Sequence, residues 1–577
     1  MSAGPGRVLS LELPSVSAPP RRPPIWPTMV RFPSSSSASA VVLALLASAP
    51  SPARAVDVTV SLDYSTYIGT AQASTGVTEW LGIRFAAPPL GDLRFARPQD
   101  PAVVSTPQPA NTHAKVCLGT GKPSNATDTS EDCLFLDIYA PSNATTASRL
   151  PVFFFIQGGG FNENSNANLN GTGLVNASGN NIIVVTVNYR VGPYGFLTNG
   201  DELQLNNGLY DQRKAMEWVQ GYIAQFGGDP GHVVLGGDSA GAASISLHLA
   251  AFGGRDDGLF HAAAAESVSF ATVLTVEESQ YQYDNLALRL GCVGSSNETL
   301  ACLRSKTAVE LQDANYNIPY PGAASAPRYM YNPVIDGDLI RELTYTAFAD
   351  GNFVKVPIIV GDDTNGGTSF APQDTSTLAQ SNVWIRNQFP YVTLEQFAAI
   401  NELYPNPNDT CPNVGCYWRQ AADTYGEMRY MCPGLYVTAA YADYGVPQSW
   451  HYRWNVEDPA QIAAGEGVPH TVELNAIFGP LNTNNNSPLS YYANGTNAHA
   501  VPVVQAYWTS FIRSYDPNTY RLNGTAEWQA WDDNAQQRIL FDTGGVTSME
   551  SLAGSDLMAR CDYWYGIGVD IRQKRTI

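Results

Sequence analysis

The segment 233–242 carries the residues best suited to chemistry. A short apolar run, 233–235, is typical of a strand, a helix-compatible stretch begins at Ala243, and the turn Gly237-Asp238-Ser239-Ala240-Gly241 joins the two. A Gly-x-Ser-x-Gly turn in this context is so tight that its glycines stand where Cβ atoms would collide, and it presents the serine at the end of a sheet. We therefore predict that Ser239 is a nucleophile suited to attack an ester carbonyl.

A second glycine-rich turn, 157–161, directly follows the apolar run 151–156. Successive glycines let backbone N–H groups approach a ligand closely. In acyl transfer, such donors stabilise the oxyanion of the tetrahedral intermediate together with the N–H of the residue after the nucleophile. We expect this oxyanion hole to consist of Gly159, Gly160 and Ala240.

The elements that must position these turns alternate along the chain. Predicted strands are 151–156, 181–187, 233–235, 354–361 and 451–454, and predicted helices include 207–226 and 503–513, of which the last is expected to close the chain. Strands that alternate with helices predict an α/β fold with a mostly parallel central sheet flanked by helices. Since no internal repeat or long linker interrupts 56–577, we expect a single domain there.

Residues 1–55 are expected to be an N-terminal extension and a secretory signal peptide. After Met29, a positive residue precedes a short apolar core at 41–47, and Ala53-Arg54-Ala55 is a small-x-small cleavage site. Met29 is the expected true start, and the core is too short to span a membrane. The net charge of −20 disfavours nucleic acid and anionic membrane surfaces as partners. We expect a secreted, extracellular protein without a membrane span.

Four further motifs carry a resemblance to a known family. They are Glu131-Asp132-Cys133-Leu134-Phe135-Leu136-Asp137-Ile138-Tyr139-Ala140-Pro141, Asn188-Tyr189-Arg190-Val191-Gly192, Gly208-Leu209-Tyr210-Asp211-Gln212 and Phe226-Gly227-Gly228-Asp229-Pro230. Together with the serine turn they resemble the type-B carboxylesterases, which include fungal lipases and the cholinesterases. The resemblance implies an α/β-hydrolase fold, a Ser–His–acid triad and a small carboxylic ester as substrate. It implies no metal and no cofactor, because this chemistry needs neither.

The general base should follow the nucleophile in the chain order of this fold. The histidines that qualify by order are His248, His261, His451, His470 and His499. Residues 465–474 resemble the catalytic-histidine motif of the family, a loop that leads into a helix. The resemblance therefore assigns the base to His470, which would take the Ser239 proton and return it to the leaving alcohol.

The acid of the triad departs from the family pattern. The family carries Glu in a loop after a strand, and Gly366 stands at that place in the run 361–370. Three alternatives remain open: Asp363 or Asp362 supplies the carboxylate, an acid comes from elsewhere, or the enzyme is slow or inactive. We favour Asp363 over Asp362. Asp238 is a milder departure, since the family more often has Glu before the serine; it either helps to organise water and His470 or is a structural acceptor.

The eight cysteines agree with secretion. By resemblance, two pairs match disulfide loops of the family, Cys117–Cys133 and Cys292–Cys302, and the remaining four are assigned as Cys411–Cys416 and Cys432–Cys561. In the interfacial lipases of the family the first loop is a long amphipathic lid. Here only fifteen residues, 118–132, separate the cysteines, and they have no apolar face for a lipid surface. This favours an esterase acting on soluble esters.

The sequence thus predicts a secreted serine esterase that works through an acyl-enzyme on Ser239. The alternative is a catalytically weakened or inactive binding protein on the same fold, because of Gly366; a peptidase is disfavoured by the family motifs. Glycosylation is expected at nine Asn-x-Ser/Thr sites: Asn125, Asn143, Asn170, Asn176, Asn297, Asn408, Asn485, Asn494 and Asn523. The sequence does not indicate the acyl group, the alcohol or the oligomeric state.

Overall fold

The computed structural model describes residues 55–200, 203–406, 411 and 414–573. The chain divides into two units, 1–52 and 53–577, and only the second is described below. The expected signal peptide, with Met29, lies outside the described residues, as does Asn408.

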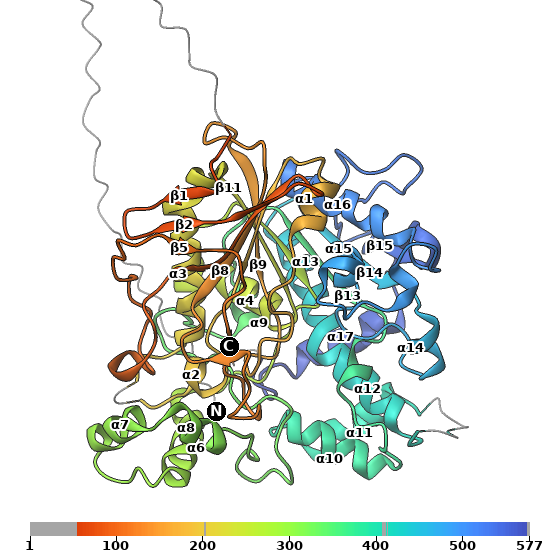
Figure 1. The fold of residues 1–577 in the computed structure, drawn as a ribbon. Coiled ribbons are helices and arrows are strands. Elements are labelled where there is room, and N and C mark those ends of the chain that lie inside the picture. Colours follow the sequence, from red (N-terminus) through yellow and green to blue (C-terminus); the bar gives the residue numbers. More distant parts are fainter. Residues whose placement is uncertain (1–54, 201–202, 407–410, 412–413, 574–577) are drawn as a thin grey trace, which may run out of the picture. The chain divides into compact units, whose positions relative to one another are not determined.

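An eleven-stranded mixed sheet forms the centre of the second unit (Figure 1). From one edge to the other its strands are β16 (Val546–Ser551), β15 (Gln537–Asp542), β14 (Ser449–Asn455), β13 (Ile358–Asp363), β12 (Ala262–Glu266), β11 (Gly228–Asp238), β9 (Leu150–Ile156), β10 (Ile183–Val187), β8 (Phe135–Pro141), β4 (Val77–Arg84) and β3 (Thr70–Gln72). The seven strands from β15 to β10 run parallel, and those at both edges are antiparallel. The long buried runs of the sequence supply the parallel strands, as expected for strands covered on both faces.

The strand order changes direction at β9, which lies between β10 and β11. The chain therefore leaves β9 towards one side of the sheet and leaves β11 towards the other. In open α/β sheets, this divergence opens a crevice at the carboxyl ends of the two strands, where ligands bind. The glycine turn 157–161 and Ser239 follow β9 and β11, so the order of the strands brings these two turns together.

Helices cover both faces of the sheet (Figure 1). Because side chains alternate along β9, Phe154 packs in one core with helices α3 (Asn207–Tyr222), α4 (Ala240–Leu249) and α13 (Cys432–Asp443). Phe153 packs in the opposite core with α1 (Thr172–Ala177) and α16 (Ala500–Ser514). Both cores consist of closely packed buried side chains, and they hold the glycine turn 157–161 and the Ser239 turn between two layers.

The remaining helices extend the two helical layers or lie at their margins. They are α2 (Gly192–Phe196), α5 (Ala251–Gly254), α6 (Val276–Arg289), α7 (Ser296–Ser305), α8 (Ala308–Ala314), α9 (Thr344–Ala349), α10 (Leu378–Gln388), α11 (Leu394–Leu403), α12 (Trp418–Gly426), α14 (Pro459–Ala463), α15 (Leu474–Ile477) and α17 (Asp556–Gly566). Short strands form two small sheets: β1 (Thr59–Ser61), β2 (Thr66–Ile68) and β5 (Gln108–Pro109) in one, β6 (Val116–Cys117) and β7 (Thr129–Ser130) in the other.

The structure confirms the α/β class and the predicted strands at β9, β10, β11 and β14. Two expectations are corrected. The run 354–361 becomes strand only from Ile358, since Pro357 lacks the N–H that a ladder requires. The helix at 503–513 is present as α16 but does not close the chain, because β15, β16 and α17 follow it.

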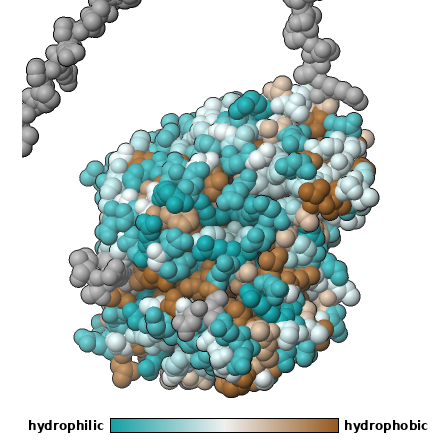
Figure 2. Space-filling view, turned by 90° about the vertical axis from the view of Figure 1, so that its left-hand side faces the viewer, coloured by the Kyte–Doolittle hydropathy of each residue, from teal (hydrophilic) through white to brown (hydrophobic). Residues whose placement is uncertain are grey.

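The eight cysteines form four disulfides with the expected pairing: Cys117–Cys133, Cys292–Cys302, Cys411–Cys416 and Cys432–Cys561. Within the described residues, no helix is both long and apolar enough to cross a bilayer. The face that carries β1, β2 and α3 is largely hydrophilic, with apolar side chains gathered in a band across its lower half (Figure 2).

Candidate active site

Ser239 lies at the turn from β11 into α4 in a strained backbone conformation, φ 54° and ψ −114°. Gly241 is required there, because a Cβ on it would lie 1.9 Å from the carbonyl oxygen of Ile156 at the end of β9. The Ser239 N–H donates to the carbonyl of Glu266 at 2.8 Å, which anchors the turn to the neighbouring strand. Strain that the surrounding structure imposes on one residue is typical of a nucleophile elbow.

The oxyanion loop lies directly against this elbow. A Cβ on Gly158 would come within 2.9 Å of the Ser239 Cβ, and Gly159 adopts φ 114°, where a Cβ would meet the Glu163 carbonyl at 1.9 Å. Among the described residues, no hydrogen-bond partner is found for the N–H groups of Gly159 and Gly160. The Ala240 N–H belongs to the first turn of α4, whose N–H groups are not used within the helix. These three groups are the donors expected from the sequence.

Asp238 anchors the oxyanion loop through both of its carboxylate oxygens. Its Oδ1 accepts from the Gly158 N–H at 2.9 Å, and its Oδ2 accepts from Asn166 Nδ2 at 2.7 Å. Burial raises the pKa of Asp238 to about 7, although both hydrogen bonds oppose the shift. Asp238 is therefore an acceptor that ties the end of β11 to the loop after β9.

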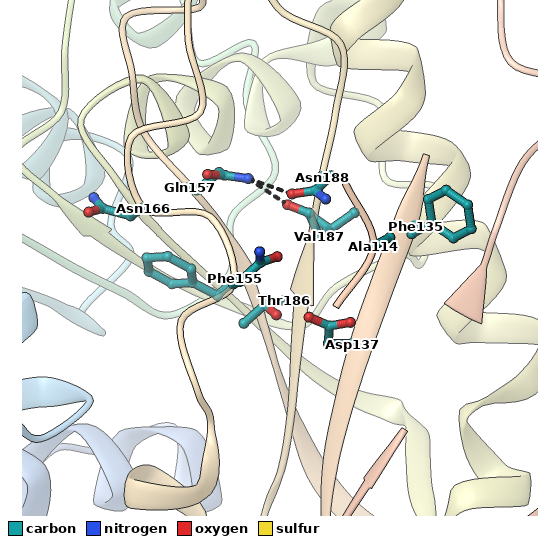
Figure 3. A pocket seen from close by; sticks show the side chains of 10 residues that line it. Ala114, Phe135, Asp137, Phe155, Gln157, Asn166, Thr186, Val187 and Asn188 are labelled. Atoms are coloured by element: carbon teal, nitrogen blue, oxygen red, sulfur yellow. Dashed lines mark hydrogen bonds between the residues drawn. The ribbon is translucent and has the colours of Figure 1, made fainter. Parts of the chain in front are cut away.

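A polar pocket lies beside this anchor (Figure 3). Its walls include Gln157 and Asn166, and Gln157 Nε2 donates to Val187 O at 3.3 Å and Asn188 Oδ1 at 3.0 Å. Gln157 Oε1 is buried and has no partner, so the pocket suits an ordered water. These contacts join the start of the oxyanion loop to the end of β10.

His470 lies in the loop between α14 and α15, as the sequence predicts. Its N–H donates to Ser369 Oγ at 3.2 Å, and its ring packs on Tyr430 and Phe370 with centroid distances of 4.1 and 5.1 Å. Within the described part of the chain, both ring nitrogens are buried without a hydrogen-bond partner. Burial and, to a smaller extent, the nearby charge of Arg429 lower the pKa of His470 to about 3. The imidazole is therefore neutral at physiological pH, the form that a general base needs.

Gly366 leaves space beside this ring. A Cβ built on it would lie 3.8 Å from His470 Nδ1 and 3.9 Å from Tyr430 Cδ2, with no closer neighbour. A side chain at position 366 would therefore approach Nδ1, the nitrogen that the acid of a triad contacts.

The two aspartates at the end of β13 point to opposite faces of the sheet, because side chains alternate along a strand. Asp362 Oδ2 lies 3.3 Å from His451 Nε2 and 3.7 Å from Arg538 Nη1, away from the candidate site. Asp363 Oδ2 accepts from the Thr471 N–H at 2.6 Å and from Ser267 Oγ at 3.2 Å. Asp363 thus contacts the backbone of the His470 loop, and no hydrogen bond joins it to the ring.

Asp363 belongs to a group of buried carboxyls behind the elbow. Burial raises the pKa of Asp363 and of Glu266 well above the usual range, and the neighbouring Glu473 raises both further. Glu473 itself has a raised pKa through burial, and its Oε1 accepts from Tyr452 Oη at 2.8 Å. Sequence reasoning missed Glu266 and Glu473, although each had a signal: Glu266 ends the apolar strand β12, and Glu473 follows His470 by three residues.

Arg429 was also missed. It lies in a π-helical turn, Glu427–Met431 (η4), between α12 and α13, and only 4% of its surface is exposed. Its Nε donates to Ser269 Oγ at 2.9 Å. The signal in the sequence was a lone cation in a run rich in tyrosine and methionine, 425–431. Turns of this kind are frequent at functional sites.

Comparison with known proteins agrees with this geometry. A model described as "Carboxylesterase family" matches residues 57–564. The chain belongs to the carboxylesterase family. Secreted lipase 1 of Botryotinia fuckeliana is 30% identical over 538 residues, which cover 85% of this chain and 90% of that protein. Carboxylesterase 1F of Mus musculus is 28% identical over 534 residues, covering 86% and 91%.

The fold is that of the α/β-hydrolases. The crystal structure of Aspergillus niger EstA matches with a TM-score of 0.86 and 42% sequence identity, covering 90% of this chain and 99% of that chain. Of the groups expected in a carboxylesterase site, the structure brings together Ser239, the three N–H donors and the carboxylate of Asp238. Asp363, at the end of β13, accepts from the backbone of the His470 loop, and Gly366 provides no side chain beside Nδ1 of the His470 ring.

Proposed function

We propose that this carboxylesterase-family protein is a secreted serine hydrolase that cleaves carboxylic esters through an acyl-enzyme on Ser239. The observation that carries the proposal is the strained Ser239 elbow in contact with a loop whose Gly159 and Gly160 N–H groups are free. A strained nucleophile next to preorganised donors is costly for a fold to maintain without a reaction to serve. The names of relatives such as Secreted lipase 1 support the same class and location.

The reaction proceeds in two balanced steps. His470 takes the Ser239 proton while Oγ attacks the carbonyl carbon, and the N–H groups of Gly159, Gly160 and Ala240 stabilise the oxyanion. The tetrahedral intermediate collapses, His470 returns the proton to the leaving alkoxide, and the alcohol departs. Water then attacks the acyl-enzyme with His470 as base, which releases the carboxylic acid and restores Ser239.

In this proposal Asp363 serves His470 through the backbone. Its Oδ2 holds the Thr471 N–H and so orients the loop. Because burial raises its pKa well above the usual range, the charged form of Asp363 is disfavoured, and it stabilises the imidazolium less than an easily ionised carboxylate in contact with the ring would. We therefore propose an enzyme slower than one with a complete triad, in which a carboxylate stabilises the imidazolium.

We propose soluble esters as substrates. Loop 118–132 is held to its surroundings, since the Thr120 N–H donates to Asn162 O at 2.7 Å and the Gly121 N–H donates to Asn315 O at 2.8 Å. A loop tied at these points, with the β6–β7 pairing near its ends, does not act as a lid that opens on a lipid surface. Marked activation when tributyrin passes its solubility limit would contradict this.

A binding protein on the same fold is the second candidate. Gly366 and the unpartnered ring of His470 favour it, because both are features of a triad that no longer works as a unit.

Hydrolysis of p-nitrophenyl acetate and butyrate decides between the two. We expect turnover by the wild-type protein and a loss of at least roughly 10³-fold in kcat for Ser239→Ala. Ser246→Ala is a matched control in the same helix, where the hydroxyl only donates to the Ala242 carbonyl, and it should retain turnover. Equal residual rates for wild type and Ser239→Ala, with both proteins folded, would support the binding protein.

A further inference from the structure

Arg429 is a buried cation without an anionic partner. Five arginines of the described chain are buried. Four of them form ion pairs: Arg94 with Glu131, Arg190 with Asp211, Arg213 with Asp257 and Arg538 with Glu550. For Arg429 no carboxylate lies within ion-pair distance in the part of the chain that the structure describes, and the charged or polar neighbours that act on it are four tyrosines.

Those tyrosines do not replace an anion. The Arg429 guanidinium carbon lies 5.5 Å from the ring centre of Tyr329, 5.6 Å from that of Tyr425 and 5.9 Å from that of Tyr430. These distances are at the outer limit of a cation–π contact. The hydroxyls of Tyr425 and Tyr430 are buried and interact with each other, and that of Tyr425 also interacts with Arg429, but within the described residues neither makes a hydrogen bond of good geometry. The site thus holds a buried charge without a carboxylate partner, which is costly when nothing is bound.

On two sides of Arg429, a single aromatic ring separates it from the proposed catalytic groups. The Tyr329 ring, which faces it, also covers Gly160, where a Cβ would lie 2.4 Å from that ring. The Tyr430 ring lies between it and His470. Ser269, which accepts from Arg429 Nε, lines a mainly apolar cavity with Phe161 and Ala243, next to the oxyanion loop and one turn of α4 after Ser239.

We propose that Arg429 binds a carboxylate carried by the ester substrate, so that half-esters of dicarboxylic acids, or esters of hydroxy acids, are preferred over neutral esters. The proposal rests on the proposed function and specifies its substrate class. Hydrolysis of a half-ester anion consumes one water and yields an alcohol, a dicarboxylate and one proton. The bound carboxylate pairs with the guanidinium, accepts from the hydroxyls of Tyr425 and Tyr430 and leaves the ester group at Ser239.

The same contact affects the base. The charge of Arg429 opposes formation of the imidazolium on His470, as the lowered pKa of His470 indicates. A substrate carboxylate next to Arg429 offsets this charge during proton transfer. Arg429 would therefore favour anionic substrates both by binding them and by the effect of the pair on His470.

Two matched pairs of esters test the proposal and identify which side of the ester carries the carboxylate. Monoethyl succinate against ethyl butyrate places it on the acyl side, and O-butyrylglycolate against propyl butyrate places it on the alcohol side. With kcat/KM followed by pH-stat, we expect wild type to prefer the anion in one pair. Arg429→Met should lower the anionic-to-neutral ratio in that pair by about tenfold to a hundredfold, and Arg429→Lys should lower it less.

The ratio makes the result independent of a general loss of rate. An anionic-to-neutral ratio that is the same in wild type and in folded Arg429→Met, for both pairs, would overturn the inference. If Arg429→Met does not fold, titration calorimetry on Ser239→Ala decides. Tighter binding of either anionic ester than of its neutral match supports the site, and equal affinities reject it. This measurement needs no turnover, so failure of the esterase proposal and failure of the anion site are distinguished.

Discussion

Gly366 lacks the side chain that would contact His470 Nδ1, and a Cβ built on it meets no atom closer than 3.8 Å. We expect Gly366→Glu to raise kcat for p-nitrophenyl butyrate by roughly tenfold or more, because a carboxylate there would fix the tautomer of His470 and stabilise its imidazolium. The Cβ would enter without a clash, at 3.8 Å from Nδ1. Steady-state kinetics on the purified variant measures the effect.

Gly366→Gln is the matched control, since it has the same size without the charge, and it should not raise kcat. The pH profile gives a second readout. The acid limb of kcat/KM in wild type should lie far below pH 6.5, because burial lowers the pKa of His470 to about 3. In Gly366→Glu the limb should move to higher pH, since a carboxylate favours the charged ring. Gains of equal size from Glu and Gln would contradict the role of the missing charge.

Residues that belong to a motif were predictable one by one, whereas residues that act through the fold were not. The spacing of the elbow predicted the turn at Ser239 and Ala240, which the structure contains, because the turn itself requires that spacing. Arg429 comes 41 positions before His470 in the chain, and only the packing of Tyr430 between them makes them neighbours. No local pattern reports such a contact.

At the scale of elements, the catalytic geometry depends on how the end of β11 holds the loop after β9. Asp238 makes this connection with two hydrogen bonds, to the Gly158 N–H and to Asn166 Nδ2. Asp238→Asn keeps one acceptor oxygen but turns an NH₂ group towards one of two donors, so one contact is lost. We expect kcat to fall by roughly tenfold or more with KM little changed, because the oxyanion donors are displaced from the transition state.

The exchanged pair Asp238→Asn/Asn166→Asp tests this connection. The amide introduced at position 238 can accept from the Gly158 N–H and donate to the carboxylate introduced at position 166. The double variant should therefore recover most of the lost kcat, while Asn166→Asp alone should not. A double variant no better than Asp238→Asn would mean that the charge at position 238, and not the link between β9 and β11, is what the reaction needs.

The elements themselves were predictable where burial on both faces gives a continuous apolar run. This applies to β9 and β10, at the centre of the sheet. Strands β15 and β16 were not predicted, because they mix charged residues such as Arg538 and Glu550 with apolar ones near the edge of the sheet. Strand β8 was visible only as part of a family motif, since Asp137 interrupts its apolar pattern.

At the scale of the whole molecule, acidic residues outnumber basic ones, and several of the acids are buried. Net charge is −20, and Glu266, Asp363 and Asp238 are held in the interior with raised pKa values through burial. Two buried histidines shift the other way: burial lowers the pKa of both His248 and His470 to about 3. The two sets of groups act on stability in different pH ranges.

Above pH 7.5 the groups with raised pKa values decide the pH dependence of stability. The buried histidines are neutral in the folded protein, and an unfolded histidine, with a pKa of about 6.5, is largely neutral there as well. Burial raises the pKa of Glu266 and Asp363 well above the usual range, so the folded protein holds their protons more tightly than the unfolded chain does. Asp238, with a pKa of about 7, shares this behaviour. His113 adds to it: burial lowers its pKa, but the hydrogen bond and charge of Asp137 together with the charge of Glu79 outweigh burial and raise it. The folded state therefore binds more protons than the unfolded state, and stability falls as pH rises.

We expect the free energy of unfolding, measured with urea, to decrease from pH 7.5 to pH 8.5 by up to about 1.4 kcal/mol per pH unit for each proton that the folded state retains. Glu266→Gln should flatten this slope, because it removes one titrating group and keeps the acceptor for Trp508 Nε1, now 2.8 Å from Glu266 Oε1. The free energy of unfolding of the variant should therefore rise relative to that of wild type as pH rises. Parallel slopes for the two proteins would mean that Glu266 is ionised in the folded state. The pH dependence of the free energy of unfolding would then come from the other buried carboxyls.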